Sequence, residues 1–178
     1  MTRANALALL MHGLTSIAIA GTHGKTTTSS MTTVAFQACG TDPSFAIGGT
    51  LSASGSNAHR GSGPYFIAEA DESDGSFIAY HPRAAIITNI EHDHVDFFST
   101  AEEVVAVFRD FTETIPNDGI LVYCNDDAGS QSMGDSVKHC VTYSYGVSEG
   151  SDLKIDQITL TAQGSQARAI WKGSVVGV

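Results

Sequence analysis

Basic residues are scarce in this chain. Lysine and arginine number 9 against 19 aspartates and glutamates, which gives a formal net charge of −10. A surface so poor in positive charge does not suit a nucleic acid or an anionic membrane, so we expect neither as a partner. A small ligand that carries phosphates remains compatible, because one lysine and a metal ion can reverse the field locally.

Long apolar runs and a leader-like N-terminus are also missing. No hydrophobic stretch approaches the roughly 20 residues of a membrane-spanning helix, and the first residues lack the basic region and cleavage site of a signal peptide. Cysteine is sparse, and Cys39, Cys124 and Cys140 are dispersed, which is typical of reduced thiols. These absences predict a cytoplasmic protein. The 42% hydrophobic and 16% charged residues fit a folded globular domain.

A phosphate-loop pattern stands near the N-terminus. The apolar stretch 16–20 leads into G-T-H-G-K-T-T at residues 21–27, a shorter form of the usual G-x-x-x-x-G-K-[ST] spacing. Glycines let a backbone turn tightly around a phosphate, Lys25 can reach the outer phosphates, and the Thr26 hydroxyl can ligate Mg²⁺. The alternative is a glycine turn that happens to precede a helix with a lysine. We predict that the nucleotide-binding residues are Gly21, Thr22, His23, Gly24, Lys25, Thr26 and Thr27.

Apolar runs and helical stripes alternate along the rest of the chain. We expect helices at residues 2–12 and 26–38, and a third that starts at two overlapping capping boxes, Ser99 with Glu102 and Thr100 with Glu103. Segment 48–63, rich in glycine and serine, is predicted to be a long loop or a ragged hairpin. The expected strands cover residues 16–20, 45–47, 65–68, 84–88, 120–124, 140–145, 153–160, 167–171 and 174–178.

These elements predict a three-layer α/β domain around a mostly parallel sheet, with a small antiparallel β extension at its C-terminal end. We expect residues 1–148 to form a P-loop ATP-binding domain. Residues 149–178 are predicted to be the antiparallel extension of the same domain. The chain stops inside a strand-like run, which suggests a fragment.

Two acidic clusters follow predicted strands. Glu69 stands directly after an apolar strand, as the acidic residue of a Walker-B element does, and could hold Mg²⁺ together with Thr26. For the neighbouring Asp71, Glu72 and Asp74 we expect only a solvated acidic loop. Because ligands bind outside the carboxyl ends of parallel strands, the clusters and the phosphate loop should share one edge.

The sequence H-D-H-V-D at residues 92–96 allows three interpretations. It resembles part of the metal-binding box of metallo-β-lactamase-fold hydrolases, although Phe97 stands where that box ends in histidine. It could instead supply one imidazole, His94, to a second Mg²⁺. The third interpretation, two surface histidines in an acidic loop, fits His92 better than His94.

Taken together, segments 21–27, 68–74 and 89–96 resemble the Mur ligases, the ATP-dependent amide ligases of peptidoglycan precursor synthesis, in order and approximate spacing. The resemblance covers most of residues 3–125. It implies that ATP phosphorylates the carboxylate of UDP-N-acetylmuramate and that the amine of L-alanine then displaces phosphate. No lysine occurs between Lys25 and Lys138, so the carbamylated lysine of related ligases is absent, as expected for the alanine-adding branch.

The resemblance also implies residue roles. Lys25 would contact the β- and γ-phosphates, Thr26 and Glu69 would hold a first Mg²⁺, and His94 with Glu69 would hold a second. Lys25, Glu69 and His94 are thus the implied catalytic residues. By the same resemblance, we expect the N-terminal sugar-nucleotide domain and the C-terminal amino-acid domain of the family to lie outside this sequence. We therefore expect an incomplete central domain that binds nucleotide weakly and is inactive alone.

Other functions remain open at this point. The nearest is the muropeptide-recycling ligase, which adds a tripeptide to the same sugar nucleotide and shares the histidine-bearing loop. A plain P-loop NTPase that acts as a switch would hydrolyse nucleotide without needing His94. A metallohydrolase would bind zinc at His92 and His94.

Overall fold

The computed structural model describes residues 2–52, 54–93 and 96–177. Its strands form one ten-stranded sheet in the order β10-β9-β8-β7-β6-β5-β1-β4-β2-β3. The strands are β1 (Thr15–Ala20), β2 (Ser44–Leu51), β3 (Ser56–His59), β4 (Tyr65–Glu69), β5 (Ala84–Ile87), β6 (Ile120–Cys124), β7 (Val141–Gly146), β8 (Leu153–Thr161), β9 (Gly164–Trp171) and β10 (Ser174–Gly177). The helices are α1 (Arg3–Met11), α2 (Lys25–Ala38), the 3₁₀ helix η1 (Ser76–Tyr80), α3 (Ala101–Glu113) and α4 (Ala128–Ser136).

The centre of the sheet is parallel. Strand β1 lies between β4 and β5 and is parallel to both, and β2, β6, β7 and the start of β8 continue the same direction. Antiparallel pairing is confined to β3 at one edge and to β8, β9 and β10 at the other. The predicted α/β class, with a mostly parallel sheet and antiparallel C-terminal strands, is confirmed.

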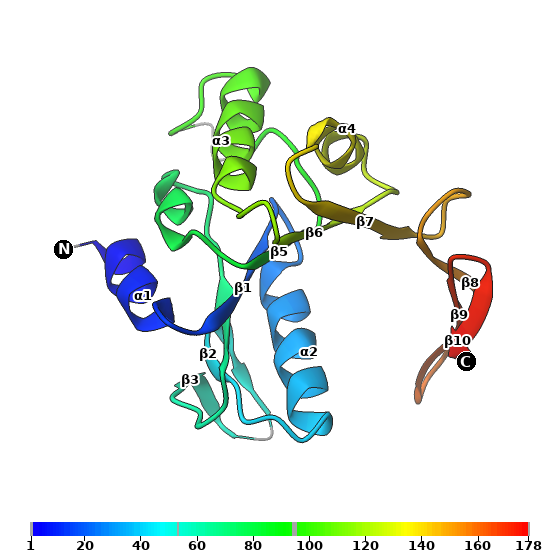
Figure 1. Ribbon diagram of the computed structural model, residues 1–178. Helices are drawn as coiled ribbons and strands as arrows, with labels where there is room; N and C mark the ends of the chain where they lie inside the picture. Colours follow the sequence, from blue (N-terminus) through cyan, green and yellow to red (C-terminus); the bar gives the residue numbers. More distant parts are fainter. Residues whose placement is uncertain (1, 53, 94–95, 178) are drawn as a thin grey trace.

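Helices cover both faces of the sheet, as Figure 1 shows: α2 lies on one side, and α3 and α4 lie on the other. The alternation along β1 divides its side chains between two cores. Ile17 and Ile19 pack with the α2-side cluster, which includes Ile67. Ala18 and Ala20 face the larger cluster, which contains buried residues of α1, η1, α3 and α4. Because both faces of β1 are buried, its sequence is a continuous apolar run instead of an alternating pattern.

Most predicted elements are confirmed to within a few residues. Segment 48–63 contains the end of β2 and all of β3, which pair with a register shift, so the ragged hairpin is the correct alternative. Helix α4 and the short η1 were not predicted. The proposed division at residue 148 stays a prediction, because β8 simply continues the sheet beside β7.

Within the described part of the chain, no helix combines the length and the apolar character needed to cross a lipid bilayer.

Candidate active site

The phosphate-loop residues connect β1 to α2 at the carboxyl end of the strand. Gly24 is the N-cap of α2 with φ +80°, and no side-chain hydrogen bond caps this end of the helix. The first-turn N–H groups of α2 are thus not engaged by a capping side chain, which is the arrangement that favours an anion at a helix N-terminus. The loop predicted from G-T-H-G-K-T-T is therefore present, and its residues lie where a phosphate could be bound.

Lys25 is folded back into this loop. Its Nζ donates to Gly21 O at 2.7 Å and to Thr22 O at 3.1 Å, and it lies 2.9 Å from both carboxylate oxygens of Glu72. Only 13% of the lysine side chain is exposed. The positive charge is thus held at the N-terminus of α2, next to the site of the expected phosphates.

Glu72 is the residue that sequence reasoning placed wrongly. It was expected in a solvated acidic loop with Asp71 and Asp74, but it is 1% exposed, whereas its two neighbours lie at the surface. Burial raises the pKa of the Glu72 carboxyl, and the hydrogen bond from Lys25 partly offsets that shift. The sequence offers one weak signal: Glu72 stands at the i+2 spacing that Ala68 and Ala70 begin, and all three side chains are buried.

Glu69 joins α2 to the neighbouring strand β2. Thr26 Oγ1 donates to Glu69 Oε1 at 3.0 Å, and the N–H of Gly48 donates to Glu69 Oε2 at 2.7 Å. The Gly48–Gly49 pair permits this approach, because a Cβ at Gly48 would lie 2.6 Å from Glu69 Oε1 and one at Gly49 would lie 2.8 Å from Thr26 Cγ2. The sequence placed both glycines in the predicted long loop or ragged hairpin and gave no sign of this role.

The segment after β5 holds the phosphate loop from its other side. Asn89 accepts from the N–H of His23 through Oδ1 at 2.7 Å and donates through Nδ2 to His23 O at 3.1 Å. Thr22 Oγ1 accepts from the N–H of Glu91 at 2.9 Å. Thr22 and His23, predicted to bind nucleotide, thus also fix the loop to β5, while Thr27 lies exposed on α2.

The structure describes only part of the predicted histidine cluster. His94, the predicted ligand of a second metal ion, lies outside the described residues. His92 is exposed, and its Nε2 lies 3.1 Å from Phe98 O. Among the described residues, no three histidine, cysteine, aspartate or glutamate side chains gather as a group that could hold a metal ion.

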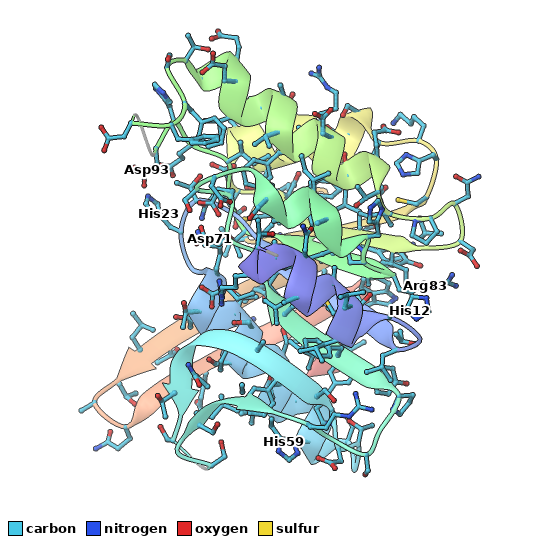
Figure 2. All side chains as sticks on the ribbon, turned by 90° about the vertical axis from the view of Figure 1, so that its left-hand side faces the viewer. His12, His23, His59, Asp71, Arg83 and Asp93 are labelled. Atoms are coloured by element: carbon cyan, nitrogen blue, oxygen red, sulfur yellow. The ribbon has the colours of Figure 1, made fainter. Side chains whose placement is uncertain are left out.

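Figure 2 shows that the clusters share one edge of the sheet. His23, Asp71 and Asp93, which follow β1, β4 and β5, lie toward one side of the molecule. His12 and Arg83, which precede β1 and β5, lie toward the opposite side. The carboxyl ends of these parallel strands therefore bring the phosphate loop and both acidic segments together, as the sequence predicts.

The arrangement suits a polyphosphate with a metal ion. Thr26 and Glu69 supply hydroxyl and carboxylate oxygens within hydrogen-bond distance of each other, and oxygen ligands of this kind are those that Mg²⁺ prefers. Lys25 supplies the positive charge and α2 supplies its N-terminus. The residues present thus fit the nucleotide and the divalent ion that the loop pattern suggests.

Comparisons with known proteins agree with this geometry. A family model described as the Mur ligase middle domain matches residues 19–176. A UDP-N-acetylmuramate–L-alanine ligase of Mycobacterium marinum is 55% identical over 135 residues, 76% of this chain and 28% of that protein. The Mycobacterium tuberculosis ligase of the same name is 58% identical over 127 residues, 71% of this chain and 26% of that protein. The chain thus spans about a quarter of the length of these curated relatives.

Solved structures share the fold. The UDP-N-acetylmuramate:L-alanyl-γ-D-glutamyl-meso-diaminopimelate ligase of Neisseria meningitides has a TM-score of 0.84 and 27% identity, covering 97% of this chain and 57% of that one. The UDP-N-acetylmuramate–alanine ligase of Thermotoga maritima has a TM-score of 0.79 and 22% identity, covering 96% of this chain and 37% of that one. A Thermotoga maritima MurF ligase in complex with ADP has a TM-score of 0.77 and 20% identity, covering 98% of this chain and 43% of that one.

Proposed function

The chain belongs to the Mur ligase family, and from this premise we propose that it is the nucleotide-binding part of an ATP-dependent ligase that joins L-alanine to UDP-N-acetylmuramate. Identity of 55–58% to ligases of that name supports this specificity. The tripeptide-adding alternative has the weaker support, a 27% identical structure. Family membership also argues against the P-loop switch and the metallohydrolase.

The proposed reaction has two steps. A carboxylate oxygen of the muramyl substrate attacks the γ-phosphorus of ATP, which gives an acyl phosphate and releases ADP. The amine nitrogen of alanine then attacks the acyl carbon, phosphate leaves, and an amide forms with loss of a proton. Two anions must meet in the first step, so positive charge near the γ-phosphate is the main requirement of the site.

Three described residues would meet that requirement. Lys25 would bind the β- and γ-phosphates through its ammonium group, which the loop already holds at the N-terminus of α2. Thr26 and Glu69 would hold Mg²⁺, which screens the negative charge of the phosphates. His94 keeps its proposed role as a ligand of a second Mg²⁺ together with Glu69.

The observation that carries this proposal is the contact of Thr26 with Glu69 beside the uncapped end of α2. A hydroxyl from α2 and a carboxylate from β4 meet there, next to the backbone N–H groups that would bind a phosphate. We propose that the chain alone binds ATP weakly, with help from Mg²⁺, and does not ligate alanine, because it spans about a quarter of its relatives.

Two variants of Thr26 test the proposal. Thr26→Val removes the hydroxyl and keeps the side-chain shape, so the gain in ATP affinity that Mg²⁺ provides should fall by about tenfold. Thr26→Ser keeps the hydroxyl and should retain that gain. Calorimetric titration of ATP into each chain, with and without Mg²⁺, measures the difference. An unchanged Mg²⁺ effect in Thr26→Val would refute the proposed metal ligand.

A further inference from the structure

The buried ion pair of Lys25 and Glu72 has no role in the reaction described above. The Lys25 ammonium group has three N–H donors, and its nearby acceptors are Gly21 O, Thr22 O and the Glu72 carboxylate. The side chains are 13% and 2% exposed. The lysine that should bind an outer phosphate therefore has protein acceptors for all three of its donors in this structure.

An incoming phosphate needs one of these acceptors to give way. The two carbonyl groups belong to the loop backbone, which contacts to Asn89 and Glu91 hold in place. Glu72 comes from the segment after β4, and its carboxylate carries the same sign of charge as a phosphate. The carboxylate is thus the partner that a polyphosphate would both repel and replace.

We propose that Glu72 is a positioning residue: it holds Lys25 in the empty loop and yields the ammonium group to the outer phosphates when nucleotide binds. This inference rests on the proposed function. It adds that the site carries an internal anion which takes the place of the phosphate between binding events. A buried lysine left without such a partner would be costly, which gives the pair a reason to exist in the empty site.

This role differs measurably from a purely structural one. If Glu72 competes with phosphate, neutralising it should strengthen the binding of ligands that reach Lys25. This should hold even though the nucleotide-free protein becomes less stable. If the pair only supports the fold, the same change should leave affinity unaltered or reduce it. The direction of the change in affinity therefore separates the two roles.

The first measurement determines how accessible the Lys25 amine is when no nucleotide has been added. Lysine acetylation by acetic anhydride, with quantification by mass spectrometry, reports how accessible each amine is. Lys25 should be acetylated several-fold faster in Glu72→Gln than in the wild-type chain, because the amide no longer binds the ammonium strongly. Asp71→Asn is the matched control, since it removes an equal charge from an exposed neighbour and should leave the Lys25 rate unchanged.

The second measurement compares nucleotide affinities, which report whether phosphate replaces Glu72 as the partner of Lys25. In Mg²⁺, Glu72→Gln should bind ADP and ATP about tenfold more tightly than the wild-type chain does, because no internal anion competes for Lys25. AMP lacks the outer phosphates and should bind both chains equally. Asp71→Asn should match the wild-type chain for all three nucleotides. Glu72→Asp keeps the charge on a shorter side chain and should shift both measurements in the same direction by less, which provides the test if Glu72→Gln fails to fold.

Several results would overturn the inference. These are equal Lys25 acetylation in the Glu72 variants and the wild type, an ATP affinity that is unchanged or lower, a gain that extends equally to AMP, or the same gain in Asp71→Asn. Failure of the wild-type chain to prefer ADP and ATP over AMP is a different result. It would contradict the proposed function itself and, with it, the exchange of Lys25.

Discussion

Gly21 shows how strictly the phosphate loop depends on its backbone. Its φ is +137°, a conformation that residues with a side chain rarely adopt, and a Cβ there would overlap the hydroxyl of Thr88. The same hydroxyl donates to His23 O at 2.6 Å. The absence of a Cβ at Gly21 thus lets Thr88, which directly follows β5, approach closely enough to fix the loop.

The first prediction concerns this position. Gly21→Ala should lower the free energy of unfolding by about 2–5 kcal/mol, because backbone strain and overpacking add. Gly40→Ala is the control: its φ is +77°, but nothing lies within 4 Å of an added Cβ, so strain alone should cost about 1–2 kcal/mol. Urea denaturation of the two variants measures both costs. Equal losses would show that the contact with Thr88 does not constrain the loop.

At this scale, the sequence predicts residues whose neighbours along the chain define their role. Lys25 and Thr26 follow from the glycine-lysine-threonine pattern, and Glu69 follows from its place at a strand end. Glu72 and Asn89 do not, because their partners lie 47 and 66 residues away in sequence. Only the order of strands in the sheet brings such residues together, and no local pattern contains that order.

The start of helix α3 is determined by residues that are adjacent in the sequence. Thr100 is its N-cap and accepts from the N–H of Glu103, while the Glu103 carboxylate accepts from the N–H of Ser99 at 2.6 Å. The sequence offers two overlapping capping boxes, and the structure uses Thr100 with Glu103. The expected pairing of Ser99 with Glu102 is not the one that starts the helix.

The second prediction tests this choice. Thr100→Ala should lower the free energy of unfolding by about 1 kcal/mol, because it removes the acceptor for a helical N–H group. Ser99→Ala leaves the backbone N–H that Glu103 binds and should change stability by less than about 0.5 kcal/mol. Thermal unfolding of both variants gives the comparison, and the reverse ranking would place the cap at Ser99.

The Asp42 carboxylate is one of the groups that hold the segment after β3. Asp42 accepts from the N–H of Ser62 at 2.8 Å and from its hydroxyl at 3.0 Å, and it lies 3.0 Å from His59 Nε2. The Ser62 N–H, followed by His59 and the Ser62 hydroxyl, holds the pKa of Asp42 below its ordinary value of 3.8. Its ionised form is therefore favoured by folding.

The third prediction is the pH dependence that follows. A lowered folded-state pKa contributes stability that is present above about pH 3.8 and is lost as the pH falls through the lower folded-state value. Asp42→Asn should be less stable than the wild type at pH 7, and the difference should shrink toward pH 3. Ser62→Ala keeps the main backbone donor and should retain most of the pH dependence. Urea denaturation at both pH values checks this, and a constant difference would contradict it.

Helix α4 was missed because its sequence, A-G-S-Q-S-M-G-D-S, is a poor helix former. Tertiary contacts make it helical. Asp127 caps it through Ser130 N at 2.7 Å and also accepts from Ile90 N at 3.0 Å, and Met133 is buried. The apolar strands, in contrast, were predictable because burial on both sheet faces leaves a run that few other structures produce.

Over the whole molecule, a central parallel sheet between helices sets what the site can do. The carboxyl ends of β1, β4 and β5 carry Lys25, Glu69, Glu72 and Asn89 to one edge, although these residues are far apart in sequence. The fold class could be predicted from alternating strands and helices. The strand order, and with it the buried pairing at the loop, could not.

We propose that one nucleotide polyphosphate occupies this edge of the sheet. A crystal of the chain soaked with Mg²⁺ and a non-hydrolysable ATP analogue would show where the phosphates and the metal ion bind. We expect the phosphates at the N-terminus of α2, the Lys25 ammonium on the outer phosphates, and the metal ion between Thr26 and Glu69. Phosphates bound away from α2, or a metal ion that contacts neither Thr26 nor Glu69, would contradict the account.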